Sequence, residues 1–549
     1  MKVGARLLRS VFWYAAVVLP YVYAQQPGSV FLKGPYLQGP SSNVMTIKWE
    51  APLDGGAVLR YGLNGKLDQE MTLKPARSQT VHTANSATDT DQSGANTNET
   101  TVYLYEAALT NLRPASVYTY SAELGSVRTP PKKFRTLPAD ESKVTFIAYG
   151  DVRTNPKTHS AVVANFKRYS PDFILHTGDL VASGPRYELW SKEFFGPLAN
   201  VLDEVPILPS IGNHEGDGKN YLFYLQLPGK GRWYSSDLGP VHVLALDFHY
   251  EKDSDEQFAF AREDLKKSKA PWKIVYLHYP VFNIGGHNTA WGNSTYLPLF
   301  HRAKVDLVVS GHSHIYERFR PIAGREGADA WPITHITTGG GGAPLAPTYP
   351  HPALASNYMT NHFVLFEATA TTLKGRAIAI NNSVLDTFEL KKENGQPPSS
   401  YFAESYPEDV LKLSWAAAPS LTGGVASSPT SNSTAQVMFT VKPLKSVEPP
   451  IQLEITLAPP SAQSYELEQG PLKVIPPRGA EPEKVVWARV RTTGDKKLGI
   501  DGRSGDLLSP PLMFQGRLSV GTVETVAYGQ RCRISDTATE AAKQLGNGN

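Results

Sequence analysis

Cysteine is almost absent from this chain, because Cys532 is the single one among 549 residues. One thiol cannot close an internal disulfide, and a zinc site built from several thiolates is excluded with it. Long apolar runs are equally scarce, since only one, near the start, approaches the length of a membrane span. An excess of positive charge is also missing: 54 Lys and Arg stand against 51 Asp and Glu, which gives no signature of a nucleic-acid-binding protein.

The one apolar run, from Val11 to Ala24, follows three basic residues, Lys2, Arg6 and Arg9. This pattern predicts a signal peptide over residues 1–24, with cleavage before Gln25. A retained membrane anchor is the second interpretation, but the run is shorter than the ~20 residues of a spanning helix and is interrupted by Pro20. We therefore expect a secreted or periplasmic protein with no stable membrane anchor.

Glycine and proline are plentiful, at 45 and 43 residues, which favours short strands and turns over long helices. In the first segment, residues 28–138, Met45 to Trp49 alternate apolar and polar, as in a half-buried strand with Trp49 inward. Leu112, Pro114 and Tyr118 have the spacing of the tyrosine corner of a β-sandwich. This segment is therefore predicted to be a β-sandwich.

The second segment, residues 142–392, alternates strand-like and helix-like stretches and holds 13 of the 14 histidines. Two helices are predicted, over Pro156–Tyr169 and Glu256–Lys269, and the apolar runs predict five strands: Val144–Tyr149, Phe173–His176, Val241–Leu246, Ile274–Leu277 and Val305–Val309. Residues 400–536 return to alternating strands and predict a second sandwich, followed by a flexible tail, 537–549. The expected architecture is a central α/β sandwich flanked by N- and C-terminal β-sandwich domains.

Five short motifs stand at the ends of apolar runs in the second segment. They are Gly150-Asp151-Val152-Arg153, Gly178-Asp179-Leu180-Val181, Gly212-Asn213-His214-Glu215, Val275-Tyr276-Leu277-His278 and Gly311-His312-Ser313-His314. The ends of sheet strands are where α/β proteins gather ligands. Carboxylate and amide oxygens together with imidazole nitrogens suit hard or borderline divalent metals, so these motifs predict a metal site.

In this order, the five motifs resemble the calcineurin-like metallophosphoesterase superfamily, and within it the purple acid phosphatases. The sequence Gly34-Pro35-Tyr36-Leu37-Gln38 and the Trp49 strand resemble the fibronectin-III-like domain at the front of those enzymes. The resemblance implies two metal ions, Zn, Fe or Mn. It assigns one to Asp151, Asp179 and His314, and the other to Asn213, His278 and His312, with Asp179 bridging both.

The chain departs from that family at the first metal. The superfamily has Asp-x-His at the first motif, and purple acid phosphatases have a Tyr in the second motif instead, but this chain carries Arg153 and Ala182 at those two places. His159, early in a predicted helix, is a candidate replacement ligand, with a helix-surface histidine as the other interpretation. For Arg153 two interpretations stay open: a clamp on a substrate phosphate oxygen, or a salt bridge that orients a carboxylate.

Two further histidines are candidate catalytic residues. His214 stands where the family places a histidine beside the transferring phosphoryl group, and its alternative role is a structural hydrogen bond. His287, in the Gly-rich loop Asn283–Asn288, matches a position that contacts phosphate or protonates the leaving group, and its alternative is a solvated loop histidine.

The resemblance implies hydrolysis of a small-molecule phosphate ester by a metal-activated hydroxide, with a phosphomonoesterase as the first expectation. A phosphodiesterase or nucleotidase with the same motifs is the first alternative, and the loops Asn220–Tyr234 and His287–Leu297 would decide between them. A non-catalytic extracellular binding protein with a decayed metal site is the second alternative. The sequence does not set the oligomeric state.

Overall fold

The computed structural model describes residues 30–84 and 97–392, apart from 226, 230, 288, 323–330 and 349–353. Between 421 and 534 it describes eleven strands and short stretches beside them. The predicted signal peptide and the predicted tail, 537–549, lie outside the described residues. Within the described part of the chain, no helix combines the length and apolar character needed to cross a bilayer.

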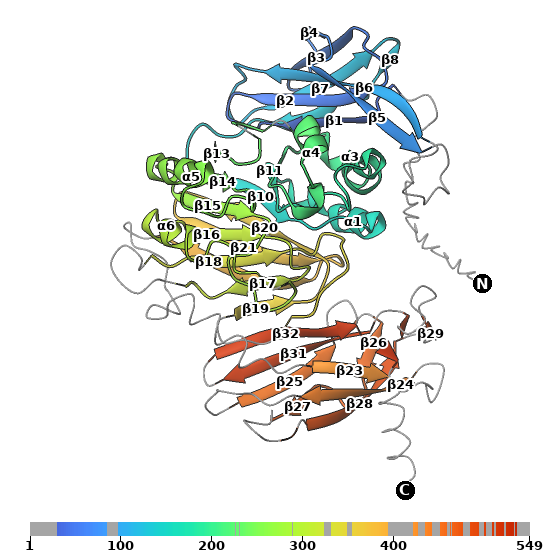
Figure 1. Cartoon of the computed structure of the whole chain (residues 1–549), viewed down its shortest axis with the longest axis vertical. Coiled ribbons are helices and arrows are strands. Elements are labelled where there is room, and N and C mark those ends of the chain that lie inside the picture. Colours follow the sequence, from blue (N-terminus) through green and yellow to red (C-terminus); the bar gives the residue numbers. More distant parts are fainter. Residues whose placement is uncertain are drawn as a thin grey trace, which may run out of the picture.

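The N-terminal part is a pair of antiparallel sheets, one ordered β1-β2-β6-β5 and the other β4-β3-β7-β8, with β9 beside β7 (Figure 1). Trp49 is fully buried between them and stacks on Tyr105, with 5.4 Å between ring centroids. The Tyr118 hydroxyl accepts a hydrogen bond from the Arg113 backbone N–H at 2.8 Å, which is the contact expected of a tyrosine corner. The strands are β1 (Lys33–Gln38), β2 (Met45–Ala51), β3 (Ala57–Leu63), β4 (Gln69–Leu73), β5 (Arg77–Ala84), β6 (Thr97–Leu109), β7 (Val117–Leu124), β8 (Val127–Arg128) and β9 (Lys132–Arg135).

Two further sheets form the centre, and their facing sides enclose one large apolar core. The six-stranded sheet has the order β12-β11-β10-β20-β21-β22, with β10, β11 and β12 parallel. Its strands are β10 (Val144–Tyr149), β11 (Phe173–His176), β12 (Ile207–Pro209), β20 (His362–Ala368), β21 (Thr372–Ala379) and β22 (Val384–Lys391).

The seven-stranded sheet has the order β13-β14-β15-β16-β18-β17-β19, with β14, β15, β16 and β18 parallel. Its strands are β13 (Tyr234–Leu238), β14 (Val241–Ala245), β15 (Trp272–Leu277), β16 (Leu307–Ser310), β17 (Tyr316–Phe319), β18 (Thr334–Thr338) and β19 (Leu354–Tyr358). Every residue of β14, β16 and β18 is buried, and β15 and β16 are mostly apolar, as expected of parallel strands covered on both faces.

Helices cover the outer faces of both sheets, which gives the central α/β sandwich that the sequence predicts (Figure 1). They are α1 (Pro156–Val163), α2 (Tyr187–Leu189), α3 (Gly196–Leu202), α4 (Lys219–Tyr224), α5 (Glu256–Lys267) and α6 (Tyr296–Arg302). Helix α1 begins where Asn155 accepts a hydrogen bond from the Thr158 N–H and Pro156 occupies the first turn. It ends six residues earlier than predicted, and a separate 3-10 turn follows over Phe166–Tyr169.

The C-terminal strands also form two main sheets, ordered β26-β28-β24-β23-β33 and β27-β25-β31-β32, with β29 and β30 paired separately. Their bounds are β23 (Leu421–Val425), β24 (Thr434–Val441), β25 (Ile451–Leu457), β26 (Tyr465–Leu467), β27 (Leu472–Val474), β28 (Lys484–Thr492), β29 (Gly499–Ile500), β30 (Leu508–Ser509), β31 (Met513–Val520), β32 (Val523–Arg531) and β33 (Arg533–Ile534). The β-rich parts therefore flank the α/β centre on both sides, as predicted.

A buried histidine fastens α5 to the edge of the seven-stranded sheet. His242 in β14 contacts Asp237 through Nδ1 at 2.7 Å and Asp264 of α5 through Nε2 at 2.8 Å. Burial by itself lowers the pKa of His242, but the hydrogen bonds with Asp264 and Asp237 outweigh burial and raise it above its usual value.

This arrangement predicts a pH-dependent contribution to stability. Because the folded-state pKa of His242 is raised, its charged form stabilises the fold fully below the unfolded pKa of ~6.5, and the stabilisation is lost as pH rises through the folded-state pKa. We expect His242→Gln to lower the melting temperature most in mildly acidic buffer and progressively less in alkaline buffer. Thermal denaturation of both proteins over a pH series measures this, and a difference that stays constant with pH would contradict it.

Candidate metal centre

The five motifs meet at one edge of the central sandwich, because each follows the carboxyl end of a strand. Asp151 follows β10, Asp179 follows β11, and Asn213 and His214 follow β12. From the other sheet, His278 follows β15, and His312 and His314 lie between β16 and β17. Parallel strands within each sheet bring these ends together, so residues up to 163 positions apart in sequence become neighbours.

Three of these residues adopt a left-handed backbone conformation that side-chain-bearing residues rarely take. The φ angles are 57° at Asp151, 56° at Asp179 and 66° at His312. Such conformations cost on the order of 1–3 kcal/mol each and cluster at functional sites, where the surrounding structure enforces them. The strand-end turns are therefore shaped by the requirements of the site.

The glycines of the motifs serve mainly close packing. A Cβ at Gly212 would lie 2.3 Å from the Asp179 backbone N, and one at Gly311 would lie 2.5 Å from Asp151 Oδ2. Both are closer than real Cβ atoms come, so only glycine allows these loops to touch. Gly178 has a further role, because its φ of +93° lies in a backbone region that glycine adopts readily and other residues rarely do.

One half of the site is a group of side-chain atoms with free lone pairs, which face one another and could bind a metal ion. The His278 ring uses Nδ1 to donate to the Thr177 carbonyl at 2.8 Å, which leaves Nε2 with its lone pair. That lone pair faces Asn213 Oδ1 at 2.8 Å and Asp179 Oδ1 at 3.3 Å. His312 Nδ1 lies 3.1 Å from the same Asn213 oxygen. Burial, followed by the neighbouring His278, lowers the pKa of His312 to about 3, which keeps the ring neutral.

The other half is a buried group of Asp151, Asp179 and His314, whose donor atoms all lie within 4.8 Å of one another. His314 donates through Nδ1 to the Pro344 carbonyl at 2.6 Å, so its Nε2 is left as an acceptor, 3.5 Å from Asp151 Oδ1. Asp151 also accepts the His312 backbone N–H at 2.9 Å. Asp179 belongs to both halves and lies between them.

These contacts fit metal coordination. Hydrogen-bond acceptors that face one another repel unless a cation lies between them. Ligands ~2.1 Å from one ion are spaced about 3.0 Å apart in octahedral geometry and about 3.4 Å apart in tetrahedral geometry. His278 Nε2 lies 2.8 Å from Asn213 Oδ1 and 3.3 Å from Asp179 Oδ1, which is close to these spacings. In both His278 and His314 the second ring nitrogen donates to a backbone carbonyl, which is the usual way that proteins orient metal-binding imidazoles.

Arg153 lies against the Asp151 half of the site. Its Nε donates to Asp179 Oδ2 at 3.2 Å, and its Nη2 lies 3.4 Å from His314 Nε2. The side chain is 16% exposed. Of the two interpretations of Arg153, the salt bridge that orients a carboxylate is therefore present in the structure, and the carboxylate is Asp179.

His159 is not brought to this group. It is fully buried in α1, where Nδ1 donates to the Glu193 carbonyl at 2.8 Å and Nε2 contacts the Tyr149 hydroxyl at 3.1 Å. Burial lowers its pKa to about 4, so the ring is a neutral hydrogen bonder. Because both ring nitrogens are engaged elsewhere, we leave His159 out of the ligand set, and the surface position considered as its alternative is also absent.

The two candidate catalytic histidines lie at the rim of the group. His214 donates its backbone N–H to Asp179 Oδ1 at 3.0 Å and uses Nδ1 to contact the Ala182 carbonyl at 2.8 Å. Its Nε2 lies 3.8 Å from Asp179 Oδ2, and the side chain is 30% exposed. The exposed His287 ring lies 4.9 Å from the His312 ring and 5.5 Å from the His314 ring, between centroids.

Two buried glutamates fix the loops that carry these residues. Glu215 accepts backbone N–H bonds from Asp179 at 2.9 Å, Leu180 at 2.8 Å and Gly212 at 2.7 Å, and so ties the second motif to the third. Burial, and then the nearby Asp179, raises the pKa of Glu215 to about 8. In the sequence, Glu215 is simply the last residue of the third motif, and its role in joining two loops is not visible there.

Glu317 in β17 has the same function for the His287 loop, and no sequence signal pointed to it. It accepts the Ile284 and Gly285 N–H groups at 2.9 and 2.7 Å, and also the Thr348 hydroxyl. The Ser313 hydroxyl, one residue from both metal-site imidazoles, accepts the His287 N–H at 3.1 Å. The loop that presents His287 is thus fastened to the same strand end as His312 and His314.

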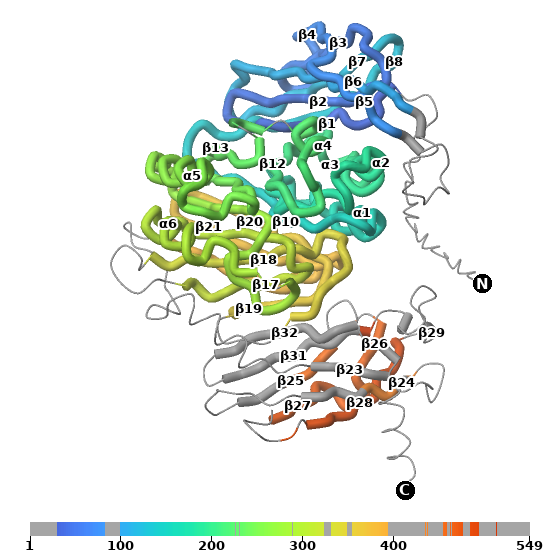
Figure 2. The backbone as a smooth tube through the Cα atoms, in the orientation of Figure 1, coloured from blue at the N-terminus to red at the C-terminus, as the bar shows by residue number. Residues whose placement is uncertain are grey.

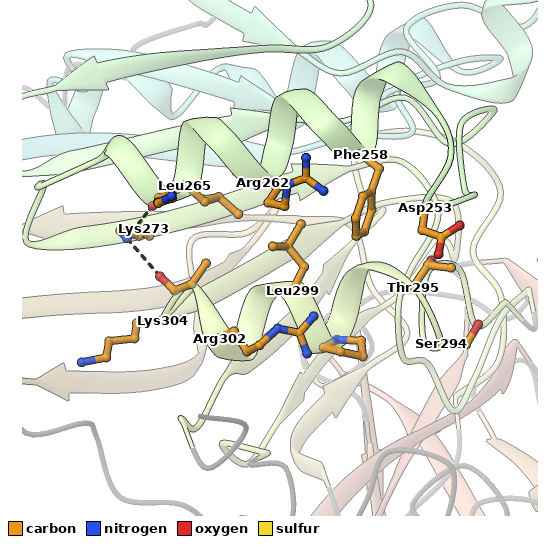
Figure 3. Close-up of a pocket in the computed structure, with 13 residues that line it drawn as sticks. Asp253, Phe258, Arg262, Leu265, Lys273, Ser294, Thr295, Leu299, Arg302 and Lys304 are labelled. Carbon is orange, nitrogen blue, oxygen red and sulfur yellow. Dashed lines mark hydrogen bonds between the residues drawn. The ribbon is translucent and has the colours of Figure 1, made fainter. Parts of the chain in front are cut away.

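A separate cavity of about 710 Å³ lies between α5 and α6 and shares no lining residue with the five motifs. Figure 3 shows Arg262 and Phe258 of α5 facing Leu299 and Arg302 of α6 across it. Lys273 closes one end by donating to the Leu265 and Ala303 carbonyls at 2.7 and 3.0 Å. The cavity is therefore a groove between helices, and the candidate site is the strand-end group.

Comparison with known proteins identifies the same region. Residues 144–316 match the model of the calcineurin-like phosphoesterase family. The chain is 26% identical over 397 residues to an uncharacterized protein of Mycobacterium tuberculosis, covering 57% of this chain and 74% of that protein. It is 30% identical over 259 residues to purple acid phosphatase 21 of Arabidopsis thaliana, covering 42% of this chain and 56% of that protein.

Acid phosphatase type 7 of Danio rerio is 27% identical over 343 residues and is matched over 54% of this chain and 72% of its own length. Among solved structures, a purple acid phosphatase from yellow lupin seeds superposes with a TM-score of 0.54 at 19% identity, covering 67% of this chain and 77% of that one. This likeness shows that the two proteins share a fold.

Proposed function

Because this chain is a purple acid phosphatase-like member of the calcineurin-like metallophosphoesterase superfamily, and hence a phosphoesterase, we propose that it hydrolyses phosphate monoesters at two adjoining metal positions. The observation that carries the proposal is the convergence of acceptor atoms around Asp179 from both halves of the site.

The first position would be held by Asp151, Asp179 and His314, and the second by Asp179, Asn213, His278 and His312. Zn, Fe or Mn ions bound there would supply Lewis acidity and a water molecule whose pKa is lowered toward ~7. The family uses a binuclear centre, and the spacing of the donor atoms supports the same use in this chain.

Binding of the phosphoryl group and protonation of the leaving group are assigned to side chains at the rim of the metal group. His214 is held through Nδ1, so its half-buried Nε2 is free to hydrogen-bond a phosphoryl oxygen held beside Asp179. His287, fixed through Ser313 and the Glu317-bound loop, would donate the proton that the leaving alkoxide or phenolate needs. Arg153 would keep Asp179 charged and oriented, and a direct clamp on a phosphate oxygen stays a proposal.

A small substrate panel tests the reaction and its specificity. We expect p-nitrophenyl phosphate to be hydrolysed with a kcat/KM at least about tenfold above that of bis(p-nitrophenyl) phosphate, with activity lost on chelation and regained with added metal. A reversed preference would replace the monoesterase with the diesterase or nucleotidase. Purified protein that neither binds metal nor hydrolyses any ester would instead support the non-catalytic binding protein.

We also propose that the chain is exported after cleavage before Gln25, and that its modules are bounded at 28–138, 142–392 and 400–536. N-terminal sequencing of the protein secreted from its own host tests the first statement, because a chain that retains Lys2 would contradict it.

A further inference from the structure

We infer that Arg153 acts as a fixed cation at the Asp151 side of the centre, so that the two metal positions differ strongly in affinity. The position at Asn213, His278 and His312 binds its ion tightly, whereas the position at Asp151 and His314 binds its ion weakly. This inference rests on the proposed function, since it concerns the same centre.

The first argument is where the guanidinium lies. The guanidinium contacts Asp179 Oδ2 at 3.2 Å and His314 Nε2 at 3.4 Å. Both atoms belong to the residues that would bind the ion at the first position. The His314 contact engages the one ring nitrogen that is left after Nδ1 donates to Pro344. A guanidinium carries a positive charge, so an ion entering here must displace Arg153 or share ligands with that charge.

The second argument is the number of ligands on each side. Four residues offer ligand atoms to the second position. Among the described His, Cys, Asp and Glu side chains, three group at the first: Asp151, Asp179 and His314. The family's Asp-x-His has Arg153 in place of its histidine, and Ala182 stands in place of the tyrosine. His159, the nearest substitute in sequence, is turned toward Tyr149 and Glu193.

The third argument is that the backbone groups of Ala182 already form hydrogen bonds with residues other than the ligands of the first position. The Ala182 N–H donates to Glu193 Oε2 at 2.7 Å, and its carbonyl accepts from His214 Nδ1 at 2.8 Å. The loop is thus built around a small residue and offers no side chain to the first position. Positive charge beside Asp179 is instead supplied by Arg153, which keeps a cation opposite a bound phosphoryl group when only one metal is present.

The experiment is metal stoichiometry in variants of residue 153, measured by mass spectrometry after gel filtration and by titration calorimetry with Zn²⁺. Arg153→His restores the family's Asp-x-His, and Arg153→Met removes the charge without adding a ligand. We expect about one tightly bound ion per chain in the wild type and about two in Arg153→His, with the second ion bound at least about a hundredfold more tightly than in the wild type. Arg153→Met should fall between them.

Arg186→His is the matched control, because Arg186 is 61% exposed and pairs with Glu188, outside the metal motifs. It should leave the stoichiometry at the wild-type value, and circular dichroism should show the native fold in every variant. Two ions of equal affinity in the wild type, or a single ion in folded Arg153→His, would overturn the inference. Failure of the proposed function gives a different pattern: the same change in metal content, but no ester hydrolysis in any loaded variant.

Discussion

Replacing Asp179 with Asn will lower kcat/KM for phosphate ester hydrolysis by about a thousandfold or more, on the order of 4 kcal/mol of transition-state stabilisation. Asp179 is the one residue shared by both halves of the candidate centre, facing His278 at 3.3 Å and grouped with Asp151 and His314. Asparagine keeps the shape and the acceptor oxygen for the His214 N–H, but it removes the charge that would bind two ions.

The fold should survive this change, because Glu215 and the backbone contacts of Gly178 and Asp179 still hold the loop. The matched control is Asp253→Asn, an exposed carboxylate in the groove between α5 and α6, which should retain wild-type activity. Steady-state kinetics and bound-metal analysis of both variants provide the measurement. A folded Asp179→Asn protein with unchanged kcat/KM would remove the catalytic role of the centre.

The second large effect concerns stability. Replacing Glu50 with Ala will destabilise the protein by about 3–5 kcal/mol, because it leaves the Lys33 ammonium buried without its partner. Lys33 and Glu50 are both fully buried and lie 2.5 Å apart, and Glu50 also accepts the hydroxyls of Tyr187 and Tyr224 at 2.7 Å each. Burial lowers the pKa of Lys33 although Glu50 opposes that shift.

This cluster joins the N-terminal sheets to the α/β centre. Figure 2 shows α2, α3 and α4 next to β1 and β5, and the Tyr36 hydroxyl of β1 donates to the Tyr224 carbonyl at 2.8 Å. Glu70→Ala, which breaks the exposed Arg60–Glu70 pair, should cost only about 0–1 kcal/mol. Urea denaturation followed by tryptophan fluorescence measures the free energy of unfolding of both variants. An equal decrease in Glu50→Ala and Glu70→Ala would show that Glu50 does not stabilise the contact between the modules.

The sequence was most informative where physical patterns are local. The runs Val144–Tyr149 and Phe173–His176 became β10 and β11 with unchanged bounds, because strands buried on both faces are continuously apolar. The first helix was predicted too long, since Pro156 marks a beginning but nothing comparable marks the end at Val163.

Local sequence patterns could not predict which side chains from distant segments contact one another. Position in the chain suggested that His159 could reach Asp151, but it does not fix the direction of a side chain, and α1 turns that ring toward Tyr149. Glu317 gave no signal because its partners, Ile284 and Gly285, are more than 30 residues away. Lys33 and Glu50 likewise look like ordinary surface charges until the modules are placed together.

The most direct measurement is a crystal of the Zn²⁺- or Mn²⁺-loaded protein examined by anomalous scattering. The predicted result is a peak within about 2.0–2.3 Å of Asn213 Oδ1, His278 Nε2 and His312 Nδ1, bordered by Asp179. A crystal in which the metal lies elsewhere, or in which Asp179 points away from these atoms, would contradict the assignment of this strand-end group as a metal centre.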